Sequence, residues 1–261
     1  MFTRDRWHRL VLHLMRAVKP TLFGSLGLFA LTYGLIERLP APETLHPLLL
    51  QAPVQTPTQL APFVQDVRGQ SYLVHPHFEY TLAGLVVTQN DLAKSWLERV
   101  GFRHDPFNEK DICVVWGGTA ASGAYRDASF SSGSFTCYVQ FPSDAAFSME
   151  ELSNNHLLPA TPAIAATLHD IRVGDQIHLH GQLVDYGVGL AGVRTSSTTR
   201  IDQGNGACEV IYVDQLTILH PANAVWRLLH SSAGWGIVAS LLLWLYATFF
   251  HNFVVGERQA R

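Results

Sequence analysis

Two His-x-His pairs are the residues in this 261-residue chain whose type and spacing most directly suggest chemistry. The first pair is His75 with His77, and the second is His178 with His180. Positions i and i+2 of a strand face the same side, so each pair could offer two imidazoles to one metal ion. A complete site around His178 and His180 needs a third and a fourth ligand. The candidates are His75, His77, His104 and Asp185, provided that the fold brings them close. Histidines on the solvent face of a strand are the alternative interpretation.

A loop with arginines and hydroxyl groups, residues 187–207, is the second candidate site. Guanidinium groups and hydroxyl donors suit an anion or a peptide carboxylate. The Asn205-Gly206 step in the same loop is instead typical of a solvated hairpin turn. Both interpretations stay open, and the first predicts a binding set of Arg194, Ser196, Ser197, Arg200 and Asp202.

Serine hydrolysis is the enzymatic alternative, with Ser196 or Ser197, Asp202 and a distant histidine as its triad. No G-x-S-x-G motif accompanies these residues. The run Asn154-Asn155-His156 matches part of a nuclease motif by letters only, because no metal partners follow it. We therefore expect no catalytic residue and no cofactor.

The two ends of the chain indicate a membrane protein. Charged residues make up only 15% of the sequence, against roughly 25% in an average soluble domain. The runs Pro20–Ile36 and Ser231–Phe250 contain no charged residue, and each is long enough to cross a hydrocarbon core of about 30 Å. The sequence therefore predicts transmembrane helices over 20–36 and 224–250. The first run lacks the small-x-small site of a cleaved signal peptide, which favours an uncleaved anchor.

Charge asymmetry predicts the orientation. The tail 1–19 carries five basic residues and one acidic residue, a net charge of +4, and the tail 251–261 carries +1. The stretch between them, 20–250, carries −8. Basic flanks stay in the cytoplasm, so both termini are expected there, with the central segment in the periplasm of a bacterium and the spans in its inner membrane. A net negative domain lacks the basic surface that nucleic acid requires, so we expect no nucleic-acid partner.

Small residues recur at helical spacing in both predicted spans. Such stripes let two helices approach closely. We expect them to pack the two spans together or to build a homo-oligomer. The stripes comprise Ala30 and Gly34, and Ser232, Gly236 and Ser240.

The segment between the spans divides into a proline-rich part and a strand-rich part. Six prolines between residues 40 and 62 disfavour helix and central strand, so residues 37–69 are predicted to be an extended periplasmic linker. Residues 70–220 are predicted to form one β domain. Helical signals occur at 90–101, at Ser148 with Glu151, and at Thr161-Pro162. The predicted strands are 79–88, 111–116, 134–141, 176–186 and 208–219.

This order of strand, strand, strand, helix, strand, strand resembles the OB-fold, a five-stranded Greek-key barrel. Two segments also resemble that family, namely Leu82-Ala83-Gly84-Leu85-Val86 for its first strand and residues 174–183, beginning Gly174-Asp175, for its fourth. The chain departs from the pattern in a long first loop, 89–110, and a Gly/Ser-rich second loop, 117–133. The resemblance implies a ligand site beside the loops that follow strands one and four.

The same resemblance bears on the three cysteines. They are too few for a disulfide scaffold, and the absence of C-x-x-C pairs excludes a cysteine zinc site. In an oxidising periplasm two of them can form a disulfide. Because strand three of the barrel neighbours strands two and five, Cys137 is expected to bridge either Cys113 or Cys208. Three small buried apolar side chains are the alternative.

These observations predict a mainly β, OB-like barrel between two transmembrane helices. The expected function is that of a non-catalytic scaffold or adaptor, which binds a partner protein, a peptide or a glycan within an envelope assembly. The alternative is a metal- or haem-handling protein that uses the paired histidines. The expected partners are the lipid bilayer, envelope proteins and a second copy of the chain.

Overall fold

The computed structural model describes residues 4–92, 105–133, 136–189, 191–199, 201–202, 204 and 207–259. The chain forms two compact units. One unit comprises Met1–Arg38 together with Asn223–Arg261, and the other comprises Leu39–Ala222. The first is helical and the second is mainly β, as predicted.

The helical unit consists of α1, Arg4–Tyr33, and α5, Ala224–Gln259. Among the described residues, Ala224–Phe249 is the one stretch of helix long and apolar enough to cross a membrane. The predicted first span, 20–36, is shorter as a helix, because α1 ends at Tyr33 and the chain then forms a turn. Its uncharged helical part is only about 21 Å long at 1.5 Å per residue. The structure thus supports one of the two predicted spans by length and composition.

The two helices of this unit pack against each other. The ring of Phe29 stacks on that of His230 at a centroid distance of 3.9 Å, and Thr32 Oγ1 lies 2.9 Å from His230 Nδ1. Gly236 lies so close to Ser25 that a Cβ at Gly236 would collide with the serine hydroxyl. The predicted small-residue stripe of α5 therefore packs against α1 at Gly236, as such stripes do in membrane helix pairs.

The β unit contains ten strands within the described residues, together with short helices. The helices are α3, Gly117–Ser122, and α4, Pro162–Asp170, with single 3-10 turns at Pro42–Thr44, Pro47–Leu50, Ala124–Arg126 and Met149–Glu151. The strands are β1 Val54–Pro57, β2 Phe63–Val67, β3 Gln70–Asp91, β4 Lys110–Val115, β5 Ser129–Gly133, β6 Thr136–Gln140, β7 Leu152–Pro159, β8 Gln176–Val188, β9 Ala191–Arg194 and β10 Cys208–His220.

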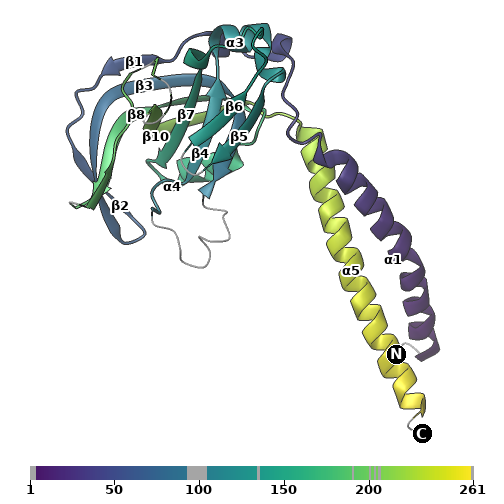
Figure 1. The fold of residues 1–261 in the computed structure, drawn as a ribbon. Coiled ribbons are helices and arrows are strands. Elements are labelled where there is room, and N and C mark those ends of the chain that lie inside the picture. Colours follow the sequence, from purple (N-terminus) through teal and green to yellow (C-terminus); the bar gives the residue numbers. More distant parts are fainter. Residues whose placement is uncertain are drawn as a thin grey trace. The chain divides into compact units, whose positions relative to one another are not determined.

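Five of these strands pair in a ring (Figure 1). β3 pairs with β4, β4 with β7 and β10 with β8, all antiparallel, while β7 and β10 are parallel. A further antiparallel pairing joins β8 back to β3. The short strands β1 and β2 add to β3, β9 adds to β8, and β5 with β6 forms a separate hairpin.

The main core lies between the ring strands. Side chains from alternate positions are fully buried there, and Leu168 and Ile171, at the end of α4, join them. Thr161 caps α4 by accepting a hydrogen bond from Ile164 N, which confirms the predicted N-cap. The ring contributes Tyr80, Leu82, Ile112, Val114, Leu157, Leu179, Ile211 and Val213 to this core.

The predicted linker over 37–69 is corrected by the structure. From Leu39 onward the chain belongs to the β unit, and β1 and β2 both pair with β3. Leu49 is fully buried in a second apolar cluster. The free energy gained by this burial fixes the segment to the β unit, although its prolines favour an extended linker. Pro42 and Pro47 open 3-10 turns, and Pro57 ends a short strand, where a missing N–H costs little.

The predicted third strand, 134–141, is also corrected. Its described part is β6 of the separate hairpin, whereas β7 is the third strand of the ring. The predicted capping box is not a helix start: Ser148 caps a single 3-10 turn, and Glu151 instead accepts hydrogen bonds from Gly118 N and Thr119 N of α3. The other four predicted strands coincide with β3, β4, β8 and β10. The helix predicted at 90–101 lies almost entirely outside the described residues.

Candidate functional site

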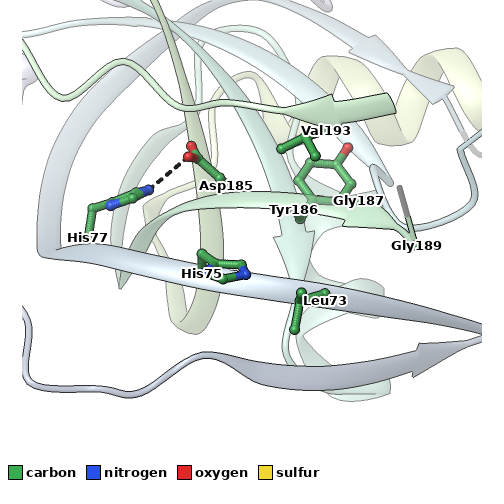
Figure 2. Close-up of a pocket in the computed structure, with 8 residues that line it drawn as sticks. All are labelled: Leu73, His75, His77, Asp185, Tyr186, Gly187, Gly189 and Val193. Carbon is green, nitrogen blue, oxygen red and sulfur yellow. Dashed lines mark ion pairs between the residues drawn. The ribbon is translucent and has the colours of Figure 1, made fainter. Parts of the chain in front are cut away.

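A cavity of about 270 Å³ lies against the paired strands β3 and β8 and is the candidate binding site of the β unit (Figure 2). One wall comes from alternate residues of β3, which face the same side of the strand. The other comes from the end of β8 and from β9, at the start of the loop 187–207. The lining residues are Leu73, His75, His77, Asp185, Tyr186, Gly187, Gly189 and Val193.

The polar end of the cavity is a fixed histidine–aspartate pair. His77 Nε2 lies 3.0 Å from Asp185 Oδ2 (Figure 2). The other carboxylate oxygen of Asp185 accepts a hydrogen bond of 2.9 Å from Ser196 N. Because both oxygens of the carboxylate are engaged, Asp185 holds the His77 ring in place while the ring stays partly exposed to a ligand.

The opposite end of the cavity is apolar. Leu73 and Val193 are 43% and 60% exposed, which is high for such side chains. Tyr186 is buried behind them and packs edge-on against Phe107. Burial raises the pKa of the Tyr186 hydroxyl, which donates a hydrogen bond to Asp105. The tyrosine is therefore neutral. Its ring and that of Phe107 pack together behind the apolar end of the cavity.

The two His-x-His pairs do not meet. In the register between β3 and β8, His75 lies opposite Asp185, whereas His180 lies opposite Thr81. These positions are separated along β8 by about 16 Å, at 3.3 Å per residue. A metal ion cannot be shared over that distance. The four predicted ligands, His75, His77, His178 and His180, therefore do not form one site.

Two of these histidines have an aspartate as a neighbour instead. His180 Nδ1 lies 2.8 Å from Asp214 Oδ1, and His77 is held by Asp185 as described above. Within the described residues, no group of three or more histidine, cysteine, aspartate or glutamate side chains is arranged to hold a metal ion.

The predicted anion-binding loop uses its polar groups to hold its own shape. Ser197 is buried, and its hydroxyl donates to Asp202 Oδ2 at 2.5 Å. Ser196 Oγ accepts a hydrogen bond of 3.0 Å from Val210 N, which fixes the loop to β10. Arg194 ends β9, and Arg200 lies outside the described residues. Ser196, Ser197 and Asp202 thus hold the loop in shape beside the cavity.

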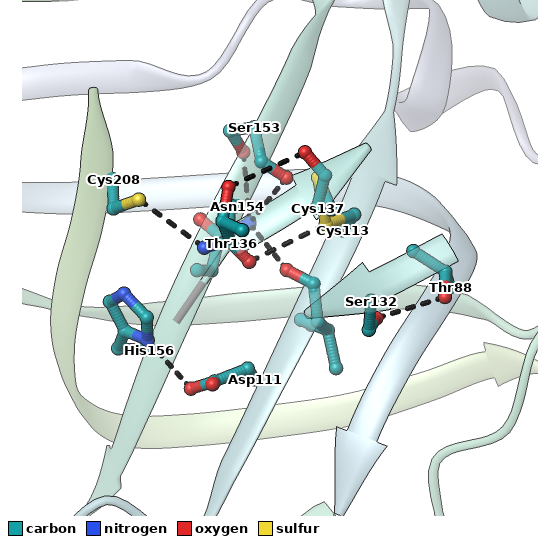
Figure 3. Close-up of a disulfide and its surroundings, with 12 residues drawn as sticks. Thr88, Asp111, Cys113, Ser132, Thr136, Cys137, Ser153, Asn154, His156 and Cys208 are labelled. Carbon is teal, nitrogen blue, oxygen red and sulfur yellow. Dashed lines mark hydrogen bonds and ion pairs between the residues drawn. A yellow bond between two sulfur atoms is a disulfide. The ribbon is translucent and has the colours of Figure 1, made fainter. Parts of the chain in front are cut away.

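One predicted disulfide is present. Cys113 of β4 and Cys137 of β6 are joined, so the covalent bond fixes the hairpin to the ring (Figure 3). This selects Cys113 from the two predicted partners of Cys137. The predicted reason was wrong, because Cys137 lies in the hairpin rather than in the third strand of the ring. Cys208 of β10 therefore stays a thiol, since the chain has only three cysteines.

Comparisons with protein families, with curated proteins and with solved structures find no match for this chain. The site was only partly visible in the sequence. His75, His77, Asp185 and the loop 187–207 were predicted, whereas Leu73 and Val193 were not. His104, another candidate ligand, lies outside the described residues. The alternation of Leu73 with the two histidines was the available signal, because it places all three on one face of β3.

Proposed function

We propose that the β unit is an OB-like barrel, anchored to a membrane, that binds a peptide segment of a partner protein. The ring order β3-β4-β7-β10-β8, closed by the β8–β3 pairing, supports the barrel. So do the parallel β7–β10 pair and the position of α4 between β7 and β8. This is a five-stranded Greek-key arrangement with its helix between the third and fourth strands, as in the OB-fold.

The proposed membrane anchor and periplasmic location are supported by α5 and by the disulfide. Ala224–Phe249 can span the bilayer, and the segment after it is net basic, which favours a cytoplasmic C-terminus. A disulfide persists in oxidising compartments, so the Cys113–Cys137 bond supports a periplasmic β unit. The five basic residues of 1–19 all lie in the first part of α1, and they favour a cytoplasmic N-terminus. The uncharged rest of α1 is then inserted beside α5 as a second membrane helix.

The cavity between His77 and Val193 is the observation that carries the binding function. Its volume of about 270 Å³ lies just below that of small-molecule sites and suits one or two side chains of a protein partner. Its apolar end favours an apolar side chain over a glycan. The neighbouring β9 is the last strand in the sheet order, so an extended peptide can add to its outer edge by backbone hydrogen bonds. The metal-handling alternative has no comparable support.

Site-directed photocrosslinking tests this function in intact cells. A photoreactive amino acid replaces Val193 in one variant and Leu73 in another, with exposed Tyr138 of β6 as the matched control position. The proposal predicts the same crosslinked protein from both cavity positions, and its loss when Val193→Asp is introduced into the Leu73 probe variant. An equal adduct from Tyr138, or adducts that survive Val193→Asp, would contradict it.

A further inference from the structure

A second polar cluster is formed by Asp111, Asn154, His156 and Cys208, which come from β4, β7 and β10 (Figure 3). Its members alternate with core residues of β4, β7 and β10, so they point away from the barrel interior. Two register pairs bring them together: Asp111 lies opposite His156, and Cys208 lies opposite Asn154.

The contacts in this cluster converge on the thiol of Cys208. His156 Nδ1 lies 2.6 Å from Asp111 Oδ1, and both side chains are almost fully buried. The His156 ring lies beside the Cys208 side chain, which helps to raise its pKa (Figure 3). Asn154 Nδ2 donates to Cys208 Sγ at 3.3 Å. Cys208 itself is only partly buried.

The His156 ring is protonated at neutral pH, because its pKa is raised. Burial alone would lower the pKa of His156, but its hydrogen bonds to Asp111 and Cys208 raise it to about 9. These two residues, from β4 and β10, are the ionisable groups that act on the ring. A protonated imidazole beside a sulfur that also accepts an amide N–H forms the kind of surroundings in which proteins activate a cysteine nucleophile.

Asp111 is itself held in position. Its Oδ1 accepts a second hydrogen bond, of 2.8 Å, from Asn108 Nδ2. An aspartate that orients a histidine, which in turn contacts a nucleophile, is the arrangement by which several unrelated folds carry out acyl transfer. Asp111, His156 and Cys208 are far apart in the sequence, on three different strands, so no local motif predicts this set.

Because Cys113 and Cys137 are joined to each other, Cys208 carries the thiol that could act as a nucleophile. Cys113 and Cys208 lie on strands that both pair with β7, opposite Asn154 on either side. Their Cα atoms are therefore about 10 Å apart, two strand spacings, which is too far for a disulfide between them. Exchange between Cys208 and Cys113 would require the ring to open.

We propose that Cys208 is the nucleophile of an acyl-transfer site, with His156 as its acid–base and Asp111 as the positioning residue for His156. The substrate class is a carboxylic ester or amide. The sulfur attacks the carbonyl carbon and forms a C–S bond, the C–O or C–N bond breaks, and His156 protonates the leaving alcohol or amine. Water then attacks the thioester, with His156 accepting its proton and returning it to the departing sulfur. This goes beyond the binding role of the cavity and does not depend on it.

The probe for this site is p-nitrophenyl acetate, applied to the full-length protein in detergent micelles. The proposal predicts a burst of p-nitrophenolate and one acetyl group per chain, placed on Cys208 by peptide mapping. Cys208→Ser should abolish the burst, and His156→Gln should slow acetylation at least tenfold. His178→Gln, which lies outside the cluster, is the matched control and should react as the wild type does. Acetylation of Cys208 at the wild-type rate in His156→Gln would overturn the proposal.

A rate measurement on the unmodified protein keeps the test independent of variant folding. The acetylation rate of Cys208 at pH 7 is compared with that of N-acetylcysteine, and the proposal predicts a rate at least tenfold higher for Cys208. Asp111→Asn should remove this advantage, and Asp111→Glu should retain part of it. A wild-type rate no higher than that of N-acetylcysteine would refute the acyl-transfer site while leaving the proposed peptide binding intact.

Discussion

His156 and Asp111 face each other across β7 and β4, with Nδ1 of the imidazole 2.6 Å from Oδ1 of the carboxylate. The two side chains are 4% and 3% exposed, so almost no water shares the interaction. A buried charge costs several kcal/mol unless it is paired, and each of these residues therefore requires the other. The pair links the stability of the ring to pH.

The stability of the protein should fall between pH 6.5 and pH 9 because of His156. Its pKa is raised from 6.5 to about 9 in the folded state, so its contribution is complete below pH 6.5 and is lost as pH rises through 9. The expected loss is on the order of 3 kcal/mol. Chemical denaturation at several pH values measures it, and the fall should be absent from His156→Gln but present in His178→Gln. An equal fall in His156→Gln would rule out this linkage.

Reduction of the Cys113–Cys137 disulfide should destabilise the β unit. The bond closes a loop with a sequence separation of 24, for which the chain-entropy description gives about 3 kcal/mol. Denaturation with and without dithiothreitol measures the effect. The double variant Cys113→Ser/Cys137→Ser should not respond to dithiothreitol, whereas Cys208→Ser should respond as the wild type does. Identical curves for the oxidised and reduced wild type would contradict the prediction.

Glu151 should stabilise the start of α3. Its carboxylate accepts hydrogen bonds from Gly118 N at 2.8 Å and Thr119 N at 2.5 Å. Partial burial opposes ionisation, but the hydrogen bonds from Thr119 and Gly118 prevail and lower the pKa of Glu151. Its contribution is therefore present above pH 4.5 and is lost as pH falls below that value.

Glu151→Gln should cost about 1 kcal/mol at pH 7, as the loss of a charged helix cap does. Thermal unfolding at pH 7 and pH 3.5 measures the difference, which should shrink at the lower pH. Glu150→Gln, at the neighbouring exposed position, serves as the control. A larger effect of Glu151→Gln at pH 3.5 than at pH 7 would speak against the capping role.

Gly181 should tolerate no side chain. A Cβ at this position would collide with the carbonyl oxygen of Tyr212 on the paired strand β10. We expect Gly181→Ala to destabilise the protein by about 2 kcal/mol or more, since a strand must move to relieve the contact. Gly189→Asn is the control, because Gly189 has open space around it and asparagine accepts its positive φ. Urea denaturation of both variants decides the matter, and equal midpoints would contradict the proposed crowding.

Most ring strands could be predicted because their apolar residues follow the pairing pattern of a sheet. β7 could not, since Ser153, Asn154, Asn155 and His156 look like a polar loop. The structure buries all four and satisfies polar atoms through neighbouring strands, for example by the hydrogen bond of 3.3 Å from Asn155 Nδ2 to the carbonyl oxygen of Ile112 on β4. Burial of polar residues depends on partners distant in sequence, which no local pattern reports.

The predicted linker failed for a related reason. Its prolines correctly exclude regular helix, but the burial of Leu49 against Leu85 and Tyr125 is a long-range contact. In the candidate sites, too, single residues could be predicted from the local sequence, whereas their long-range contacts could not. The histidine pairs and Asp185 were predicted as candidate ligands, but no local pattern pairs Asp185 with His77 or Asp111 with His156. Each aspartate is more than forty positions away from its histidine along the chain.

The central claim is that the β unit acts outside the cytoplasm, held there by its membrane helices. The most direct test inserts alkaline phosphatase, which becomes active only where its disulfides form, after Ala145 in a surface turn of the full-length protein, and measures its activity in intact bacteria. The account predicts an active phosphatase and an inactive β-galactosidase at the same insertion point. An inactive phosphatase together with an active β-galactosidase would contradict it.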